Sequence, residues 1–205
     1  MKFLMTGVLM SIATAALPAA SENFDKTPVG KLPAGWICGV TGKGDPRWQV
    51  EADGAAASKP NVLKQIGAGD FPWCVKQDVA LKDGVIEVKF KPLSGARDQA
   101  GGVVWRWKDG DNYYVARANA LENNVSLYYT EGGSRKTIRY VDAPVAGNVW
   151  HTLRVEFFGT TITVTLDGMR YIRLDDAHIA GAGAVGVWTK ADSVTAFDDF
   201  SYGPK

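Results

Sequence analysis

Apolar and polar residues alternate along much of the chain with a period of two. The segments 84–91, 151–159 and 161–168 place branched or aromatic residues at every second position, with charged residues or threonines between them. This alternation is typical of antiparallel strands that pack one face on a core and turn the other to solvent. No segment shows sustained helical periodicity, and glycines such as Gly110 and Gly168 interrupt the strands. The pattern predicts an all-β protein.

The number of short strands predicts how they are arranged. Many strands without helices favour two antiparallel sheets packed face to face, a jelly-roll sandwich. A chain of 205 residues suits one such domain. Residues 21–205 show no internal repeat and no linker that would divide them, so we expect a single domain.

The strands expected within residues 101–130 and 183–190 carry polar side chains at their centres. If Val103, Trp105 and Trp107 face the core, alternation places their neighbours on the opposite, outer face of the sheet. That face would hold guanidinium, amine, amide, phenol and indole groups, from Arg106, Tyr113, Arg117, Asn119, Asn124, Tyr128, Trp188 and Lys190. We expect this face to be exposed to solvent. A β-bulge in any strand would move part of the set.

The first twenty residues differ from the rest. MKFLMTGVLMSIATAALPAA has one lysine, an apolar run and then small residues, which is the layout of a secretory signal peptide. We expect cleavage after Ala20, with Ala16 as the alternative. The apolar run is too short for a membrane-spanning helix. We therefore expect an exported protein, periplasmic or extracellular, without membrane insertion.

Charge and composition narrow the class of partner. The chain has 23 basic and 22 acidic residues, a formal net charge of +1, and 46% hydrophobic residues. Proteins that bind nucleic acid usually carry a strong basic excess, so we do not expect a nucleic-acid partner. The composition is that of a globular protein with a normal core.

Cys38 and Cys74 are the only cysteines. In an oxidising compartment we expect them to form a disulfide, which would stabilise the fold by about 3–4 kcal/mol through loop closure. The alternative is a pair of buried free thiols. A zinc site has little support, because His151 and His178 show no ligand spacing with the cysteines.

Four stretches of the chain carry a family resemblance. They are AGGVVWRWKDGDNYYVARANALENNVSLYY (100–129), VWHTLRVEFFG (149–159), LDG (166–168) and GAVGVWTKADSVTAFDDF (183–200). In this order and spacing they resemble a secreted bacterial family described as 3-keto-disaccharide hydrolases or family-16-like glycosidases. The similarity spans residues 101–200 and is weaker at 32–36. It implies the concanavalin A-like, or laminin G-like, jelly roll, whose concave sheet commonly holds sugars.

The expected outer face suits a sugar. Indole and phenol rings such as those of Trp188, Tyr113 and Tyr128 stack on sugar rings, and asparagine amides bond hydroxyl groups. The cations suit carboxylate, sulfate or other electron-rich oxygens. We therefore expect a carbohydrate-binding protein whose partner is an oligosaccharide or polysaccharide.

A glycan-cleaving enzyme is the alternative. Glycoside hydrolysis ordinarily uses two carboxylates, but the Glu-x-Asp-x-x-Glu motif of family 16 is absent from this sequence. The candidate catalytic carboxylates are Glu122, at an expected turn, and Asp192, which follows Lys190; Asp98 could enter the same cleft. Glu122 could instead cap backbone amides, and Asp192 could pair with Lys190. A 3-keto sugar would need only one base and a stabilising cation, because its ketone acidifies the neighbouring C–H.

Structural calcium is the one metal worth considering, and no cofactor is otherwise expected. The stretch FDDF (197–200) places two carboxylates in the expected last strand. Jelly rolls of the resembled type often bind calcium through such an aspartate and backbone carbonyls, with Asp198 the favoured ligand. The alternative is an aspartate bonded to backbone amides. A third alternative, besides carbohydrate binding and glycan cleavage, is a structural or interaction module of the cell envelope.

Overall fold

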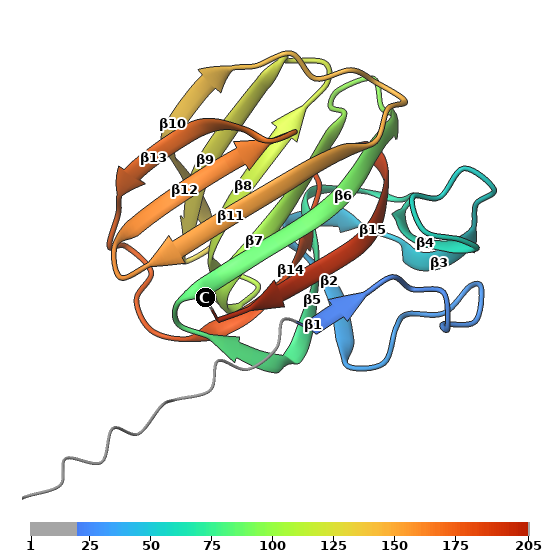
Figure 1. Cartoon of the computed structure of the whole chain (residues 1–205), viewed down its shortest axis with the longest axis horizontal. Helices are drawn as coiled ribbons and strands as arrows, with labels where there is room; N and C mark the ends of the chain where they lie inside the picture. The colour runs from blue at the N-terminus through green and yellow to red at the C-terminus, as the bar shows by residue number, and fades with distance from the viewer. Residues whose placement is uncertain (1–19, 205) are drawn as a thin grey trace, which may run out of the picture.

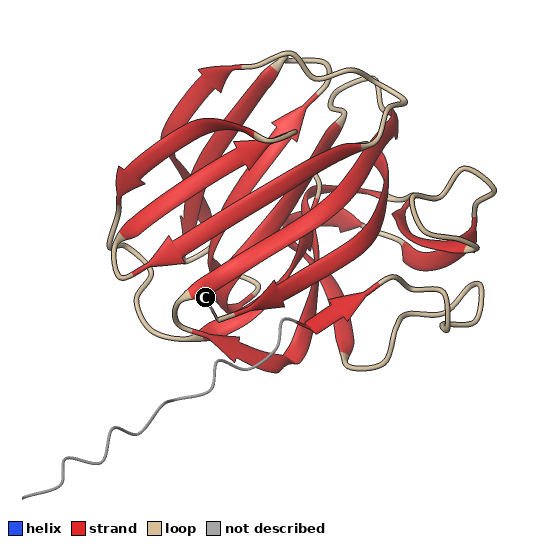
Figure 2. Ribbon diagram, in the orientation of Figure 1, coloured by secondary structure: helices blue, strands red, loops and turns tan. Residues whose placement is uncertain are grey.

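The computed structural model describes residues 20–204, and all regular secondary structure in that range is β-strand (Figure 2). The expected signal peptide lies outside the described residues, apart from Ala20. Across residues 20–204 no helix is long and apolar enough to cross a membrane. The strands form two antiparallel sheets that lie face to face, as Figure 1 shows. The all-β, two-sheet sandwich expected from the alternation is confirmed.

The larger sheet has eight strands. Their order is β13 (Met169–Asp175), β12 (Thr161–Leu166), β11 (His151–Phe158), β6 (Gly84–Ser94), β15 (Val194–Gly203), β4 (Asn61–Gln65) and β3 (Trp48–Ala52), with β1 (Ala20–Glu22) paired to β15. The smaller sheet has seven strands. Their order is β10 (Ser134–Asp142), β9 (Asn124–Glu131), β8 (Asn112–Asn119), β7 (Ala100–Asp109), β14 (Gly183–Trp188), β5 (Ala68–Leu81) and β2 (Trp36–Asp45).

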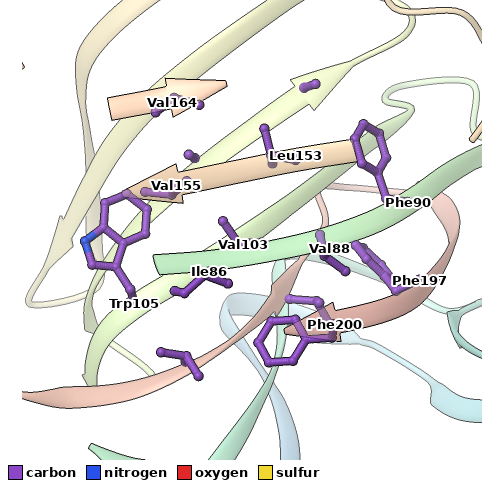
Figure 3. Close-up of a cluster of buried hydrophobic side chains, with 14 of the residues drawn as sticks. Ile86, Val88, Phe90, Val103, Trp105, Leu153, Val155, Val164, Phe197 and Phe200 are labelled. Atoms are coloured by element: carbon purple, nitrogen blue, oxygen red, sulfur yellow. The ribbon is translucent and has the colours of Figure 1, made fainter. Parts of the chain in front are cut away.

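The main hydrophobic core fills the space between the sheets (Figure 3). The larger sheet contributes alternate residues of β6 and β11, such as Val88 and Val155, and the smaller sheet contributes Val103 and Trp105 from β7. The Trp105 ring stacks on Phe157 across the interface, with ring centres 5.8 Å apart. The alternation therefore places these side chains correctly.

Cys38 and Cys74 form the expected disulfide. They lie opposite each other on the neighbouring strands β2 and β5. Because β2 is an edge strand of the smaller sheet, the bond ties that edge to the interior.

A β-bulge in β7 interrupts the alternation. The register of β7 with β8 is regular up to Trp105 and shifts before Asp109, and the register with β14 shifts as well. Arg106 has a positive φ of 46°, a left-handed conformation that few residues other than glycine adopt. The extra residue of a bulge turns the following side chains to the other face.

The bulge reverses two side-chain directions expected from the sequence. Arg106 points towards the larger sheet, where its guanidinium lies 5.8 Å from the ring centre of Phe157. Trp107 instead lies on the outer face of the smaller sheet, with its ring centre 5.2 Å from that of Trp73. The expected placement of Arg106 on the outer face, and of Trp107 in the core, is therefore wrong.

Candidate functional site

The outer face of the smaller sheet carries a second aromatic cluster, separate from the core between the sheets. Its aromatic members come from five neighbouring strands and are Phe71, Trp73, Trp107, Tyr113, Tyr128 and Trp188. Phe71 stacks nearly parallel on Trp188, with ring centres 5.9 Å apart and planes inclined by 14°. We call this surface the aromatic face.

The aromatic face is much less exposed than its polar sequence suggests. Trp188 and Tyr113 are fully buried, and Arg117 is 1% exposed. Phe71 and Trp107 keep partial exposure. The expectation of a solvent-exposed face is wrong, because large side chains from adjacent strands cover one another. Two of these side chains, Phe71 and Trp73, lie on β5. Alternation along this strand places them on the face opposite to the buried Cys74, and this was the sequence signal that could have identified them.

Arg135 of β10 covers the middle of the aromatic face. Its guanidinium carbon lies 4.4 Å from the ring centre of Phe71, 4.2 Å from that of Tyr128 and 5.7 Å from that of Trp188. Burial of the guanidinium lowers the pKa of Arg135. Sequence reasoning missed this residue, because residues 134–142 show no period-two alternation of apolar and polar residues that would identify a strand.

Glu122 joins a polar cluster at one end of the aromatic face. It lies in the turn between β8 and β9, as expected. Arg117 Nη2 donates to its carboxylate at 2.7 Å, Asn124 Nδ2 donates at 3.0 Å, and Lys190 Nζ lies 3.5 Å away. Burial opposes ionisation of this carboxyl, but the donors from Arg117 and Asn124 outweigh it and lower the pKa of Glu122 to about 2.

Asp98 is the second carboxylate of this cluster. It is 2% exposed, and Lys190 Nζ lies 2.7 Å from its Oδ2 atom. Asn119 donates its side-chain amide to the other oxygen. The ammonium of Lys190 thus lies between Asp98 and Glu122. The structure thus links Asp98 and Glu122 through one lysine, and a cleft shared by the two carboxylates stays a prediction.

The two asparagines are fully buried and position the carboxylates. Asn119 and Asn124 direct their amide nitrogens at Asp98 and Glu122 respectively. The Oδ1 atom of Asn119 accepts the backbone N–H of Leu121 at 2.9 Å. These contacts show that the two amides hold the carboxylates of Asp98 and Glu122 in place. Hydrogen bonds from the amides to sugar hydroxyls stay a prediction.

Tyr113 and Tyr128 occupy different parts of the aromatic face. The Tyr113 hydroxyl lies 2.7 Å from Thr41 Oγ1, on edge strand β2. The Tyr128 hydroxyl instead accepts a hydrogen bond from Arg117 Nη2 at 3.1 Å, beside the polar cluster. Tyr128 is thus the tyrosine that links the rings to the charged groups.

Asp192 lies outside the polar cluster and does not form the alternative ion pair with Lys190. Its carboxylate accepts the backbone N–H groups of Ala96, Arg97 and Asp98 at 2.8, 3.0 and 3.1 Å. Burial opposes ionisation, but these three amides lower the pKa of Asp192. The carboxylate thereby organises the loop that carries Asp98.

Two adjoining hollows open beside the polar cluster. The first has a volume of about 400 Å³ and is lined by Asp70, Phe71, Arg97, Asp98, Lys190 and Ala191. The second, of about 220 Å³, shares Asp70, Arg97 and Ala191 with it and extends to Lys43 and Asp192. A ligand in the first hollow would meet the ring of Phe71 together with the charges of Lys190 and Asp98.

Arg106 lies apart from this site and joins three loops. Its side chain donates to the backbone carbonyls of Lys82 at 3.0 Å, Ile179 at 3.1 Å and Gly159 at 2.7 Å. Its Nη2 atom also lies 3.4 Å from Asp83 Oδ1. These contacts give Arg106 a structural role at the end of the sandwich.

Asp198 is fully buried and surrounded by hydrogen-bond donors. Its carboxylate accepts the backbone N–H of Ser58 at 2.6 Å, the Ser58 hydroxyl at 2.8 Å and the N–H of Asp199 at 2.7 Å. Burial raises the pKa of Asp198. No group of three or more His, Cys, Asp or Glu side chains suited to a metal occurs within residues 20–204. The contacts of Asp198 match the alternative of an aspartate bonded to backbone amides, and calcium binding stays a prediction.

No protein-family model matches the chain, and no curated protein matches its sequence. The resemblance to 3-keto-disaccharide hydrolases therefore stays a prediction.

Solved structures share the fold. The carbohydrate binding module CBM66 from Bacillus subtilis superposes with a TM-score of 0.68 and 20% identity, over 82% of this chain and 95% of that one. The cellulose induced protein Cip1 gives 0.65 and 13%, over 91% and 97% of the two chains. The β-glucanase from Bacillus licheniformis gives 0.61 and 13%, over 94% and 100%. At these identities the likeness shows the fold alone, an all-β jelly-roll sandwich.

Proposed function

We propose that the protein binds a carbohydrate on the aromatic face of its smaller sheet, at the end where Phe71, Lys190 and Asp98 line one hollow. The observation that carries this proposal is the position of six aromatic rings beside a cluster of charged groups on one sheet face. Ligand sites commonly combine apolar walls with a few polar groups that orient the ligand. Rings stack on the apolar faces of a sugar, and the charged groups bond its oxygens.

The shared fold supports this class of ligand. The similar structures are named as a carbohydrate binding module, a β-glucanase and a cellulose induced protein. Fold alone does not assign a function, so the proposal depends on the site. Export fits the same function, because the disulfide is compatible with an oxidising compartment and a polysaccharide partner lies outside the cytoplasm.

Glycan cleavage has weaker support from the site. A general acid needs a pKa near the working pH, whereas the pKa of Glu122 is about 2. Asp98 is paired with Lys190, and Asp192 is bonded to three backbone amides. One arrangement does match 3-keto-glycoside chemistry, namely a carboxylate beside the cation Lys190. Product formation is therefore measured together with binding.

The test is a titration of the purified protein with neutral, acidic and 3-keto oligosaccharides, followed by thermal shift and by chromatography of products. A rise in melting temperature without products supports a binding protein. Products formed from any of these glycans would replace binding with catalysis as the function. The absence of both a shift and products across the panel would contradict a carbohydrate ligand.

A further inference from the structure

We propose that the carbohydrate carries a negatively charged group, a carboxylate or a sulfate, which Arg135 and Arg117 bind together beside Tyr128. This inference rests on the proposed carbohydrate-binding function and names the class of its ligand. Carboxylate and sulfate share the chemistry that matters here, because both present paired anionic oxygens to a planar guanidinium.

Arg135 is a cation without a counter-charge. Within residues 20–204 it forms no ion pair, although its guanidinium is packed against Phe71 and Tyr128. Its Nη1 atom is buried and has no hydrogen-bond partner among these residues. A buried charged group is ordinarily paired, because desolvation of an unpaired charge is costly. The missing partner of Arg135 therefore has the properties of an anion.

Arg117 presents a second unpaired guanidinium edge. Its Nη2 atom is used, by Glu122 at 2.7 Å and by Tyr128 at 3.1 Å. Its Nε and Nη1 atoms are buried and have no hydrogen-bond partner in the part of the chain that the structure describes. The side chain is only 2% exposed, so these two donors are not solvated either.

Both guanidinium groups gather at the ring of Tyr128. Arg135 lies 4.2 Å and Arg117 lies 5.7 Å from its centre. The nearby carboxylates do not neutralise Arg135, because Asp98 is paired with Lys190 and Glu122 with Arg117 and Lys190. Two cations of like charge beside one ring repel each other. An anionic group bound between them would remove that repulsion and satisfy the free donors.

The position of Arg135 gives a ligand access. The residue lies on β10, an edge strand, and remains partly exposed. When its guanidinium turns to bind an anion, the rings of Phe71 and Tyr128 that it now covers become free to stack on the sugar. Anion binding and ring stacking would then occur in one step at adjoining positions.

Matched oligosaccharides test the charge directly by isothermal titration calorimetry. We would compare oligogalacturonate with its methyl ester, and a sulfated galactan oligosaccharide with its desulfated form. A charge-assisted hydrogen bond to arginine should make the anionic member of a pair bind roughly tenfold tighter or more. That preference should weaken with added salt. The two pairs distinguish a carboxylate ligand from a sulfate ligand.

The variant Arg135→Gln assigns the preference to this residue, with Arg139→Gln as the matched control. Arg139 is an exposed arginine of the same strand. Arg135→Gln should abolish the preference for the anionic glycan and keep binding of the neutral one, whereas Arg139→Gln should keep both. A cooperative thermal melt of each variant establishes that it is folded.

The outcomes separate this inference from the function on which it rests. Equal affinity of the wild-type protein for both members of each pair would overturn the inference and leave carbohydrate binding intact. No binding of any oligosaccharide would overturn both. If Arg135→Gln still prefers the anionic oligosaccharide, Arg135 does not bind the anionic group. The comparison of anionic with neutral oligosaccharides uses the wild-type protein alone. It therefore tests whether the ligand is anionic even if a variant fails to fold.

Discussion

Arg106 and Arg117 lie on the neighbouring strands β7 and β8 and point to opposite sides of the same sheet. Arg117 packs over Tyr128 on the aromatic face, whereas Arg106 lies over Phe157 of the larger sheet. The bulge that follows Trp105 separates them. Two arginines that look equivalent in the sequence therefore have different roles, one beside the candidate site and one in the frame of the sandwich.

Replacement of Arg106 by methionine should destabilise the fold and spare glycan binding. Three backbone carbonyls, of Lys82, Gly159 and Ile179, would lose their donor. Ile179 is buried, whereas Lys82 and Gly159 are exposed residues whose carbonyls can bond water instead. An unpaired buried acceptor costs about 1–3 kcal/mol, so we expect the free energy of unfolding to fall by about that amount. Urea denaturation measures this loss, and calorimetric titration measures binding. If the variant keeps its stability but no longer binds the glycan, Arg106 contributes to the binding site and its structural role is wrong.

Replacement of Phe71 by alanine should weaken glycan binding about tenfold, because it removes a ring that lines the larger of the two hollows beside the polar cluster. Phe71 also stacks on Trp188, so the melting temperature should fall by a few degrees. Phe158→Ala is the matched control, since this ring lies on the other sheet and is 37% exposed. Equal binding losses in the two variants would contradict a site at Phe71.

Glu122→Gln should change how stability depends on pH. The pKa of Glu122 is about 2 in the folded protein, below the ordinary value of about 4.3. The ionised carboxylate therefore stabilises the fold above that ordinary value, and this contribution is lost as the pH falls through about 2. The wild-type protein should be more stable than Glu122→Gln near neutral pH, and the difference should shrink in acid.

Thermal melts of both proteins between neutral pH and about pH 2 check this expectation. Asp192 and Asp176 also have lowered pKa values, but they are present in both proteins, so their effects cancel in the difference. A stability difference that stays constant over the whole range would show that the charge of Glu122 does not stabilise the fold.

Loss of the disulfide should destabilise the whole domain. The bond closes a loop between residues 36 positions apart, and the chain-entropy model gives about 3–4 kcal/mol for such a loop. The double variant Cys38→Ser/Cys74→Ser should show this loss in urea denaturation, and reduction of the wild-type protein should reproduce it. An unchanged unfolding midpoint after complete reduction, confirmed by titration of two free thiols, would show that the bond contributes no stability.

Much of the fold and part of the site follow from the sequence. Period-two alternation identifies the strands, because successive side chains of a strand point to opposite faces. It correctly places Val103 and Trp105 in the core, and Tyr113, Arg117 and Trp188 on the opposite face. The cysteine pair was predictable as well, since these two residues are the only cysteines in the chain.

Tertiary structure alone decided the rest. The bulge at Arg106 depends on how β7 pairs with β8 and β14, which local alternation does not specify. Phe71 and Arg135 cover the aromatic face. They lie on β5 and β10, which are far apart in the sequence and come together only when the sheet assembles. Side-chain direction is a local property of a regular strand, so the sequence by itself determined the two faces and their chemistry outside the bulge in β7. Burial and pairing depend on which strands become neighbours. For that reason only the folded structure showed an enclosed face on which Arg117 and Arg135 keep guanidinium nitrogens without hydrogen-bond partners among residues 20–204.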